Sequence, residues 1–263
     1  MKRSEILRNA VREHYGSFAE NNSSCCAPTS NQGSCCAGPV AFDEISLQLG
    51  YSSDDLKHVP SGSNMGLGCG NPQAIASIRK GETVLDLGSG GGFDAFLAAQ
   101  QTGKAGKVIG VDMTPKMISL SRDNADKANF DWVEFRLGEI EHLPVADQSV
   151  DVIISNCVIN LSPEKQQVFN EAFRVLKKGG RLAISDVVAT AAIPEEVLKD
   201  MELYSACVSG ASTIDELENM LHNSGFTNVR INPKDESREF IKDWSSGANL
   251  VDFILSATIE ATK

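Results

Sequence analysis

The sequence has 263 residues, with 35 acidic side chains against 24 basic ones and a formal net charge of −11. A chain of this length can bury about three quarters of the surface that its unfolded form exposes, so one large core is possible. The negative charge argues against a nucleic-acid partner or an anionic membrane, and no apolar stretch reaches the roughly 18 residues that span a bilayer.

The cysteine content and the amino terminus predict where the chain works. Residues 1–20 carry charges throughout and hold no apolar core, so no secretory signal is expected. Seven cysteines without such a signal indicate a reducing, cytoplasmic compartment, where thiols more often act as ligands or catalysts than as structural bridges. Without sustained heptads or an evident exposed apolar face, we expect a monomer.

Residues 1–78 are predicted to form an amino-terminal arm and a thiol-bearing cap region. A short amphipathic helix is expected near 6–18, and a glycine-rich loop at 61–72. Between them lies a stretch rich in Ser, Asn, Gly and Cys, whose composition predicts a mobile arm. This arm carries four thiols, which are Cys25, Cys26, Cys35 and Cys36.

From 79 to 263, strands and helices alternate, which predicts an α/β domain with a mostly parallel, Rossmann-like sheet covered on both faces. The seven strands are expected near 83–87, 107–111, 132–136, 150–155, 181–187, 228–231 and 253–259, the last two being late additions. The helices are expected near 93–101, 115–127 and 163–176, with a helical insertion at about 190–225. Gly179 and Gly180 are expected to end the third helix.

The run from Val84 to Asp94, VLDLGSGGGFD, predicts a nucleoside-binding turn between the first strand and its helix. Glycines allow the backbone to pass close to a ligand, although a plain strand-to-helix turn is the alternative. Asp112 ends the second strand, where an acid can accept hydrogen bonds from ribose hydroxyls.

The loop also indicates which cofactor it binds. A dinucleotide site needs G-x-G-x-x-G, but the sixth position from Gly88 is Phe93, and no phosphate loop of the G-x-x-x-x-G-K-[ST] type occurs. An acid before the turn (Asp86), a crowded glycine loop and a later ribose acid suit a cofactor without phosphate, S-adenosylmethionine.

Further cofactor contacts follow from position in the fold. Gly88, Ser89 and Gly90 are expected along the methionyl part, and Glu139 with Ile140, after the third strand, near the adenine edge. The Asn156 carbonyl, at the end of the fourth strand, is expected to hold the methionyl amine. Met113 either covers an adenine face or belongs to the core.

Three cysteines are expected near the carboxyl edge of the sheet, where ligands bind in such folds. Cys157 follows the fourth strand, Cys69 lies in the glycine-rich loop, and Cys207 lies in the helical insertion. Each alone is more typical of a core residue. Together they favour a soft, thiophilic ligand, since no zinc-ribbon spacing or histidine cluster accompanies them.

The sequence resembles the arsenite S-adenosylmethionine methyltransferases, which have the class I methyltransferase fold, over nearly its whole length. The glycine loop is common to many methyltransferases, whereas the run SNCVINL together with Cys69 and Cys207 is more specific. The matching segments are Val11–Gly16, Gly68–Pro72, Leu85–Gly90, Gly110–Thr114, Ser155–Leu161 and Arg174–Gly180.

This resemblance implies that Cys69, Cys157 and Cys207 bind trivalent arsenic as three thiolates. It also implies an amino-terminal cysteine that pairs with the residue matching Cys69, for which the four arm thiols are open candidates. Larger relatives carry a further carboxyl-terminal domain, and we expect any contribution of that domain to be missing here.

The expected reaction needs alignment more than a base, because the methyl group of a sulfonium is already activated. The arsenic lone pair, the methyl carbon and the leaving sulfur must lie in line at about 3–3.5 Å. Methyl transfer oxidises arsenic formally, so the arm thiols are expected to reduce it, with thioredoxin or glutathione restoring them. Low thiol pKa values would favour capture of the metalloid.

Two other functions compete with this prediction. A carbon or oxygen methyltransferase of a small lipid-like molecule would have a large apolar substrate pocket and a merely packed Cys157. A non-catalytic metalloid- or metal-binding module would take up metal through its thiols without turning over the cofactor.

Overall fold

The computed structural model describes residues 3–21, 39–242, 244 and 250–263. Its centre is one sheet of eight strands, whose continuous path is β3-β2-β1-β4-β5-β8-β7, with the short β6 paired to β5. The strands are β1 Thr83–Leu87, β2 Lys107–Asp112, β3 Val133–Leu137, β4 Val150–Asn156, β5 Leu176–Ala189, β6 Ser212–Thr213, β7 Thr227–Pro233 and β8 Ile254–Thr262.

The sheet is mixed in the expected way. Strands β1 to β6 pair in parallel, and β8 runs antiparallel to both β5 and β7. The α/β fold predicted from alternating elements is therefore confirmed, with seven strands on the main path and one late antiparallel strand. Because β1 and β4 are neighbours, the strand order reverses between them, which is where ligands bind in doubly wound sheets.

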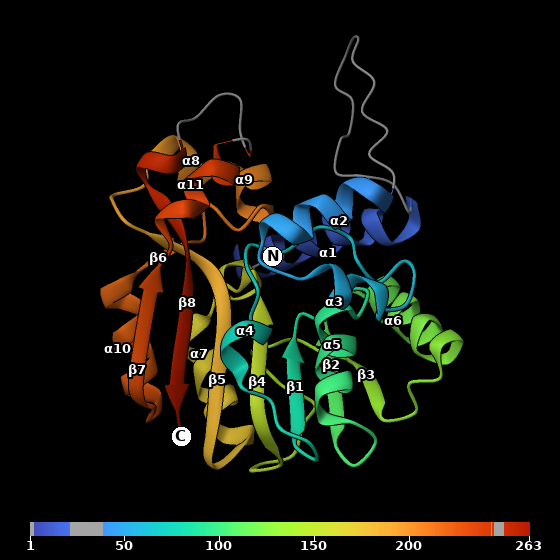
Figure 1. Cartoon of the computed structure of the whole chain (residues 1–263). Helices are drawn as coiled ribbons and strands as arrows, with labels where there is room; N and C mark the ends of the chain where they lie inside the picture. The colour runs from blue at the N-terminus through green and yellow to red at the C-terminus, as the bar shows by residue number, and fades with distance from the viewer. Residues whose placement is uncertain (1–2, 22–38, 243, 245–249) are drawn as a thin grey trace.

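Helices cover both faces of this sheet and its carboxyl edge. In Figure 1, α1, α2, α8, α9 and α11 lie above the end of the sheet towards which β1 points. The helices are α1 Arg3–Asn21, α2 Pro39–Gln48, α3 Ser53–Lys57, α4 Gln73–Ala76, α5 Phe93–Thr102, α6 Pro115–Ala128, α7 Lys165–Val175, α8 Glu195–Lys199, α9 Met201–Ser205, α10 Ile214–Ser224 and α11 Arg238–Ile241. The single 3-10 turns are η1 Ile159–Leu161, η2 Asp235–Ser237 and η3 Leu250–Asp252.

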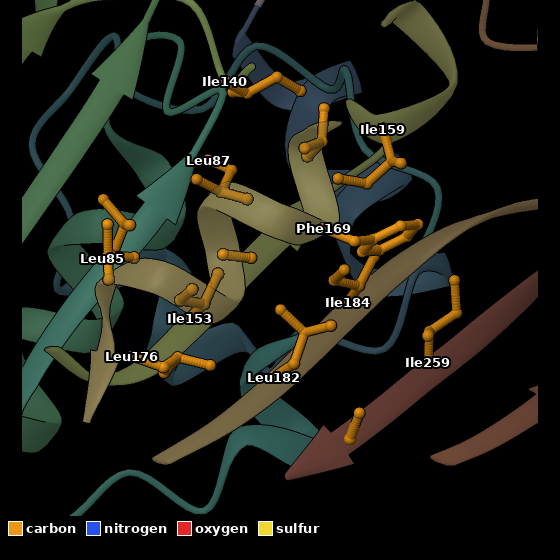
Figure 2. Close-up of a cluster of buried hydrophobic side chains, with 14 of the residues drawn as sticks. Leu85, Leu87, Ile140, Ile153, Ile159, Phe169, Leu176, Leu182, Ile184 and Ile259 are labelled. Atoms are coloured by element: carbon orange, nitrogen blue, oxygen red, sulfur yellow. The ribbon is translucent and has the colours of Figure 1, made fainter. Parts of the chain in front are cut away.

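The core divides into two layers because side chains alternate along each strand. On one face, Leu85 and Ile153 pack with α7 and α10, as Figure 2 shows for Phe169 of α7. On the other face, Val84 and Ile154 pack with α4, α5 and α6. Both layers are apolar, which explains why these strands read as continuous hydrophobic runs.

Two local expectations were wrong. Gly179 and Gly180 do not end a helix: α7 ends at Val175, and the glycines lie within β5, where the register jumps from the Val150–Leu176 pair to the Val152–Arg181 pair. The extra residues form a bulge, and Gly179 has a φ of 79° that suits glycine.

The insertion is also not one helical run. It contains α8, α9, a turn, β6 and α10, so Cys207 lies in a turn after α9. Among the described residues, no helix combines the length and apolarity needed to cross a bilayer.

We expect Phe169→Ala to destabilise the fold by about 3–5 kcal/mol, because this fully buried ring fills the layer under β1 and β4. Urea unfolding followed by circular dichroism measures the change. Leu137→Ala, at a side chain 52% exposed, is the matched control and should change the free energy of unfolding little. Equal effects of the two substitutions would contradict this account of the core.

Candidate active site

A pocket opens at the carboxyl ends of β1, β2 and β4, and helix α1 contributes to its wall through Arg8, Val11 and Tyr15. The space between its lining atoms, part of it open to solvent, amounts to about 1130 Å³. Eight of the nine predicted cofactor residues line it together with Cys157: Asp86, Gly88, Ser89, Gly90, Asp112, Met113, Ile140 and Asn156.

The glycine loop is shaped for close approach. Gly88 has a φ of 67°, and a Cβ at this position would lie 2.3 Å from a methyl carbon of Val158. The amides of Gly88 and Ser89 donate to the Val111 carbonyl at 2.7 and 3.1 Å, which binds the turn to the end of β2. A side chain at position 88 would therefore collide with the segment that follows Cys157.

Asp112 organises the loop as well as facing the pocket. Its carboxylate accepts hydrogen bonds from the Gly90 amide at 3.0 Å and the Thr114 amide at 2.8 Å. A carboxylate has about four acceptor positions, so ribose hydroxyls could use those that remain. Burial raises the pKa of Asp112, an effect that these two amide bonds oppose.

Two buried acids, Asp86 and Asp94, line the pocket. Asp86, 2% exposed, has a buried Oδ2 atom without a hydrogen-bond partner, and burial with the charges of Asp94 and Asp112 raises its pKa well above the usual value. A buried acid of this kind suits a cationic ligand. S-adenosylmethionine carries a sulfonium and an ammonium group, so the residues present fit it.

The adenine-edge segment lies only partly as expected. Ile140 lines the pocket, whereas the Glu139 carboxylate is directed to α1, 2.5 Å from Arg12 and 3.5 Å from Arg8. Glu141, which does line the pocket, accepts hydrogen bonds from Arg8 at 3.2 Å and Ser162 at 2.7 Å. These ion pairs fasten α1 over the pocket, a role that sequence analysis missed.

The Asn156 side chain joins the pocket to the loop that carries Cys69. Its Nδ2 donates to Asp94 Oδ2 at 3.1 Å, to the Tyr51 hydroxyl at 2.9 Å and to the Gly70 carbonyl at 2.9 Å. Its Oδ1 accepts from the Cys69 amide at 3.0 Å. Sequence analysis missed Tyr51 and Asp94; the position of Asp94 in the first turn after the glycine loop was the available signal.

Two glycines allow the Cys69 loop to lie flat against the sheet. A Cβ at position 68 would approach the Asn156 amide nitrogen to 2.6 Å, and one at position 70 would touch Ser185 at 3.0 Å. The Cys69 carbonyl accepts a 2.7 Å hydrogen bond from Ser256 of β8. The spacing Gly68-Cys69-Gly70 therefore brings this thiol onto the ends of β4, β5 and β8.

Cys157 and Cys207 both adopt the left-handed backbone conformation that non-glycine residues avoid. Their φ values are 58° and 64°, a conformation that costs about 1–2 kcal/mol each. The Cys157 amide donates to the Ser185 carbonyl at 2.8 Å, and the Cys207 thiol donates to the Cys157 carbonyl at 2.8 Å. Such strain is typical of functional sites held by their surroundings.

The three thiols form one buried cluster with a carboxylate. The Cys69 and Cys157 sulfurs and a carboxylate oxygen of Asp186 lie within 4.8 Å of one another. Cys207 packs in the same buried cluster as Cys69 and Cys157, and its thiol contacts Cys157. Sequence analysis did not single out Asp186; a lone acid in the apolar run from 183 to 188 was the available signal.

The thiols do not have the low pKa values that would favour capture of the metalloid. Burial raises the pKa of Cys69 to about 11 and that of Cys157 well above its usual value. For Cys207, the side-chain contact with Cys157, followed by burial, raises the pKa well above normal. The physical reason is that, among the described residues, burial and the Asp186 charge outweigh the opposing influence of the Lys234 charge on Cys69, so the thiols are protonated at neutral pH.

The remaining thiols cannot be placed. Cys25, Cys26, Cys35 and Cys36 lie outside the described residues.

Comparison with known proteins agrees with this geometry. Residues 78–225 match a family model described as a methyltransferase domain. An arsenite methyltransferase of Halobacterium salinarum is 54% identical over 263 residues, which cover 98% of this chain and 67% of the relative. The human arsenite methyltransferase is 41% identical over 157 residues, covering 56% of this chain and 42% of the relative.

A solved structure has a similar fold. An arsenic(III) S-adenosylmethionine methyltransferase from Chlamydomonas reinhardtii superimposes with a TM-score of 0.62 at 33% identity, covering 83% of this chain and 73% of that chain. This chain spans 42–67% of the length of five curated arsenite methyltransferases that it matches. It belongs to the arsenite methyltransferase family of S-adenosylmethionine-dependent methyltransferases.

Proposed function

We propose that this chain transfers methyl groups from S-adenosylmethionine to trivalent arsenic held by Cys69, Cys157 and Cys207, giving methylated arsenicals. The observation that carries the proposal is the convergence of three buried thiols, distant in sequence, beside the acidic pocket that Cys157 itself lines. The arsenite methyltransferases that the chain resembles support the choice of substrate.

Capture of arsenite by protonated thiols balances without an external base. Three sulfur–arsenic bonds form and three arsenic–oxygen bonds break, and each thiol proton leaves with an arsenic hydroxide as water. The raised thiol pKa values therefore slow the attack on arsenic, because the thiolate is the nucleophile. They do not disfavour the overall exchange, because it releases no proton to solvent. The arsenic(III) product keeps its lone pair.

The pocket residues would hold the cofactor. Asp86 and Asp94 would balance its positive charge, Gly88 to Gly90 would follow the methionyl part, and Asp112 would accept from the ribose hydroxyls. When bound, the cofactor supplies a methyl group activated by a sulfonium. Met113 and Ile140 then remain for the adenine faces, and α1 restricts access of water through Val11 and Tyr15.

Reduction of the oxidised product requires two electrons. We assign this step to a dithiol–disulfide exchange that uses Cys69 and one of Cys25, Cys26, Cys35 and Cys36, with thioredoxin or glutathione as the final reductant. Residues 1–78 would then act as a thiol-bearing cap on the methyltransferase domain and supply the second thiol of the exchange.

We expect Cys69→Ser, Cys157→Ser or Cys207→Ser each to lower arsenite methylation at least about 100-fold, because a hydroxyl cannot replace a thiolate on a soft centre and a misplaced reactant reacts slowly. Labelled cofactor, arsenite, a thiol reductant and speciation of the arsenic product measure the loss. Ala206→Ser, next to Cys207 at an exposed side chain, is the matched control.

Activity retained by all three variants would exclude the three-thiolate mechanism. Methylation of a carbon or oxygen acceptor by the Cys157→Ser variant would favour an ordinary small-molecule methyltransferase. Arsenite uptake without methyl transfer by the unaltered protein would favour a binding module.

Cofactor binding gives a second prediction. We expect Asp86→Asn to weaken S-adenosylmethionine binding about 10–100-fold, since an acid that can pair with the cationic cofactor is lost. The ligand-free protein should become no less stable, since the buried Asp86 Oδ2 atom has no hydrogen bond to lose. Calorimetric titration and thermal unfolding measure the two effects, with the exposed Asp123→Asn as control. Unchanged affinity would remove Asp86 from the cofactor site.

Thiol reactivity gives a third prediction. With Cys25, Cys26, Cys35 and Cys36 replaced by serine, alkylation of the folded protein should be slow at pH 7 and should still accelerate above pH ~9.5, because raised pKa values keep the thiols protonated. The same chain in denaturant should level off above its ordinary thiol pKa of about 8.5. Iodoacetamide labelling followed by mass spectrometry provides both profiles; coincident profiles would contradict the raised pKa values.

A further inference from the structure

Asp186 places a hard oxygen ligand beside two soft sulfur ligands. One carboxylate oxygen and the sulfurs of Cys69 and Cys157 all lie within 4.8 Å of one another. Asp186 and Cys69 are each 1% exposed and Cys157 is 6% exposed, so the group is fully inside the protein. Capture of arsenic by three thiols makes no use of this carboxylate, which therefore requires its own explanation.

The carboxylate is held in place by its surroundings. Asp186 Oδ2 accepts a 2.9 Å hydrogen bond from the Ile159 amide, and Oδ1 accepts from the Val187 amide at 2.7 Å and from Asn160 Nδ2 at 2.9 Å. Carboxylates that bind metals are usually oriented by hydrogen bonds of this kind. Oδ1 thus accepts two of these hydrogen bonds and Oδ2 accepts one, so Oδ2 is the less saturated oxygen.

The spacing is close to that of a tetrahedral site. With zinc–sulfur bonds of about 2.3 Å and zinc–oxygen bonds of about 2.0–2.2 Å, ligand atoms lie about 3.6–3.8 Å apart. The three atoms observed within 4.8 Å need to approach by about 1 Å or less. Cys207 is not a member of this set: its thiol contacts Cys157 and donates to the Cys157 carbonyl at 2.8 Å.

We propose that Cys69, Cys157 and Asp186 form a binding site for a thiophilic divalent cation of the Zn²⁺ class, which competes with arsenite. Binding forms two sulfur–metal bonds and one oxygen–metal bond and releases two thiol protons to solvent. Water would complete the coordination, and it could reach the site from the pocket that Cys157 lines. The competition rests on the proposed function, whereas the metal binding does not.

The two ligands should depend on different residues. Trivalent arsenic binds three sulfurs, so its binding requires Cys207 and does not involve Asp186. The divalent cation binds two sulfurs and one oxygen, so its binding requires Asp186 and does not involve Cys207. Cys69 and Cys157 are common to both, which is the cause of the competition.

A titration with Co²⁺, a spectroscopic substitute for Zn²⁺, tests this assignment in the full chain with Cys25, Cys26, Cys35 and Cys36 replaced by serine. We expect thiolate-to-cobalt charge-transfer bands, the d–d bands of tetrahedral Co²⁺, and displacement of Co²⁺ by Zn²⁺. Cys69→Ser, Cys157→Ser and Asp186→Asn should each weaken Co²⁺ binding by about 10–100-fold or more. Cys207→Ser should leave it within about threefold, while abolishing arsenite binding measured without divalent cations.

Co²⁺ affinity that falls in Cys207→Ser, or that survives in Asp186→Asn, would overturn the assignment. Thermal unfolding checks that each variant folds. If Asp186→Asn does not fold, X-ray absorption of the Zn²⁺-loaded parent protein decides instead: two sulfur and two light-atom neighbours support the site, and three sulfur neighbours reject it. Co²⁺ binding without any arsenite binding would contradict the proposed function and would still support the metal site.

Discussion

The side-chain amide of Asn156 is the interaction on which the site depends, because it joins two parts of the chain with different tasks. Through Nδ2 it contacts Asp94 and Tyr51 at the acidic pocket, and through Oδ1 it holds the Cys69 amide. One planar group thus fixes the distance between the pocket and the thiol loop. A shift of either element would break a buried hydrogen bond, which costs about 1–3 kcal/mol, so the two parts keep one relative placement.

The same end of the sheet imposes a steric condition on each cysteine loop. The Cys69 loop lies against Asn156 and Ser185 only because positions 68 and 70 are glycine. The Cys207 turn is closed by Gly210, where a Cβ would stand 2.0 Å from the Asn160 carbonyl oxygen. The left-handed backbone of Cys157 and Cys207 indicates that thiol position, and not local backbone preference, determines the conformation at these residues.

Sequence reasoning succeeded where information is local and failed where it is not. The strand, glycine turn and helix around Gly88 follow from hydrophobic patterning and turn chemistry, and the strand order at β1 and β4 follows from the fold class. Cys207 was expected in a helix because its left-handed turn has no residue preference to reveal it. Asp186 and Tyr51 acquire their significance only from partners far away in the chain, such as Asn160 for Asp186. Glu139 was assigned by position in the fold, yet its carboxylate is taken by Arg12 of α1.

Burial of the thiols gives the site a chemical preference as well as a shape. Protonated thiols suit a metalloid hydroxide, whose oxygens take up the thiol protons as they leave as water. A bare divalent cation must instead expel those protons to solvent, so its binding weakens as the pH falls. Burial raises the pKa of Asp186 to about 6, and its hydrogen bonds to two amides oppose that rise. Asp186 is therefore mainly charged at neutral pH, and its charge further favours protonated thiols. The same carboxylate thus provides a cation with a ligand and makes the thiols beside it harder to ionise.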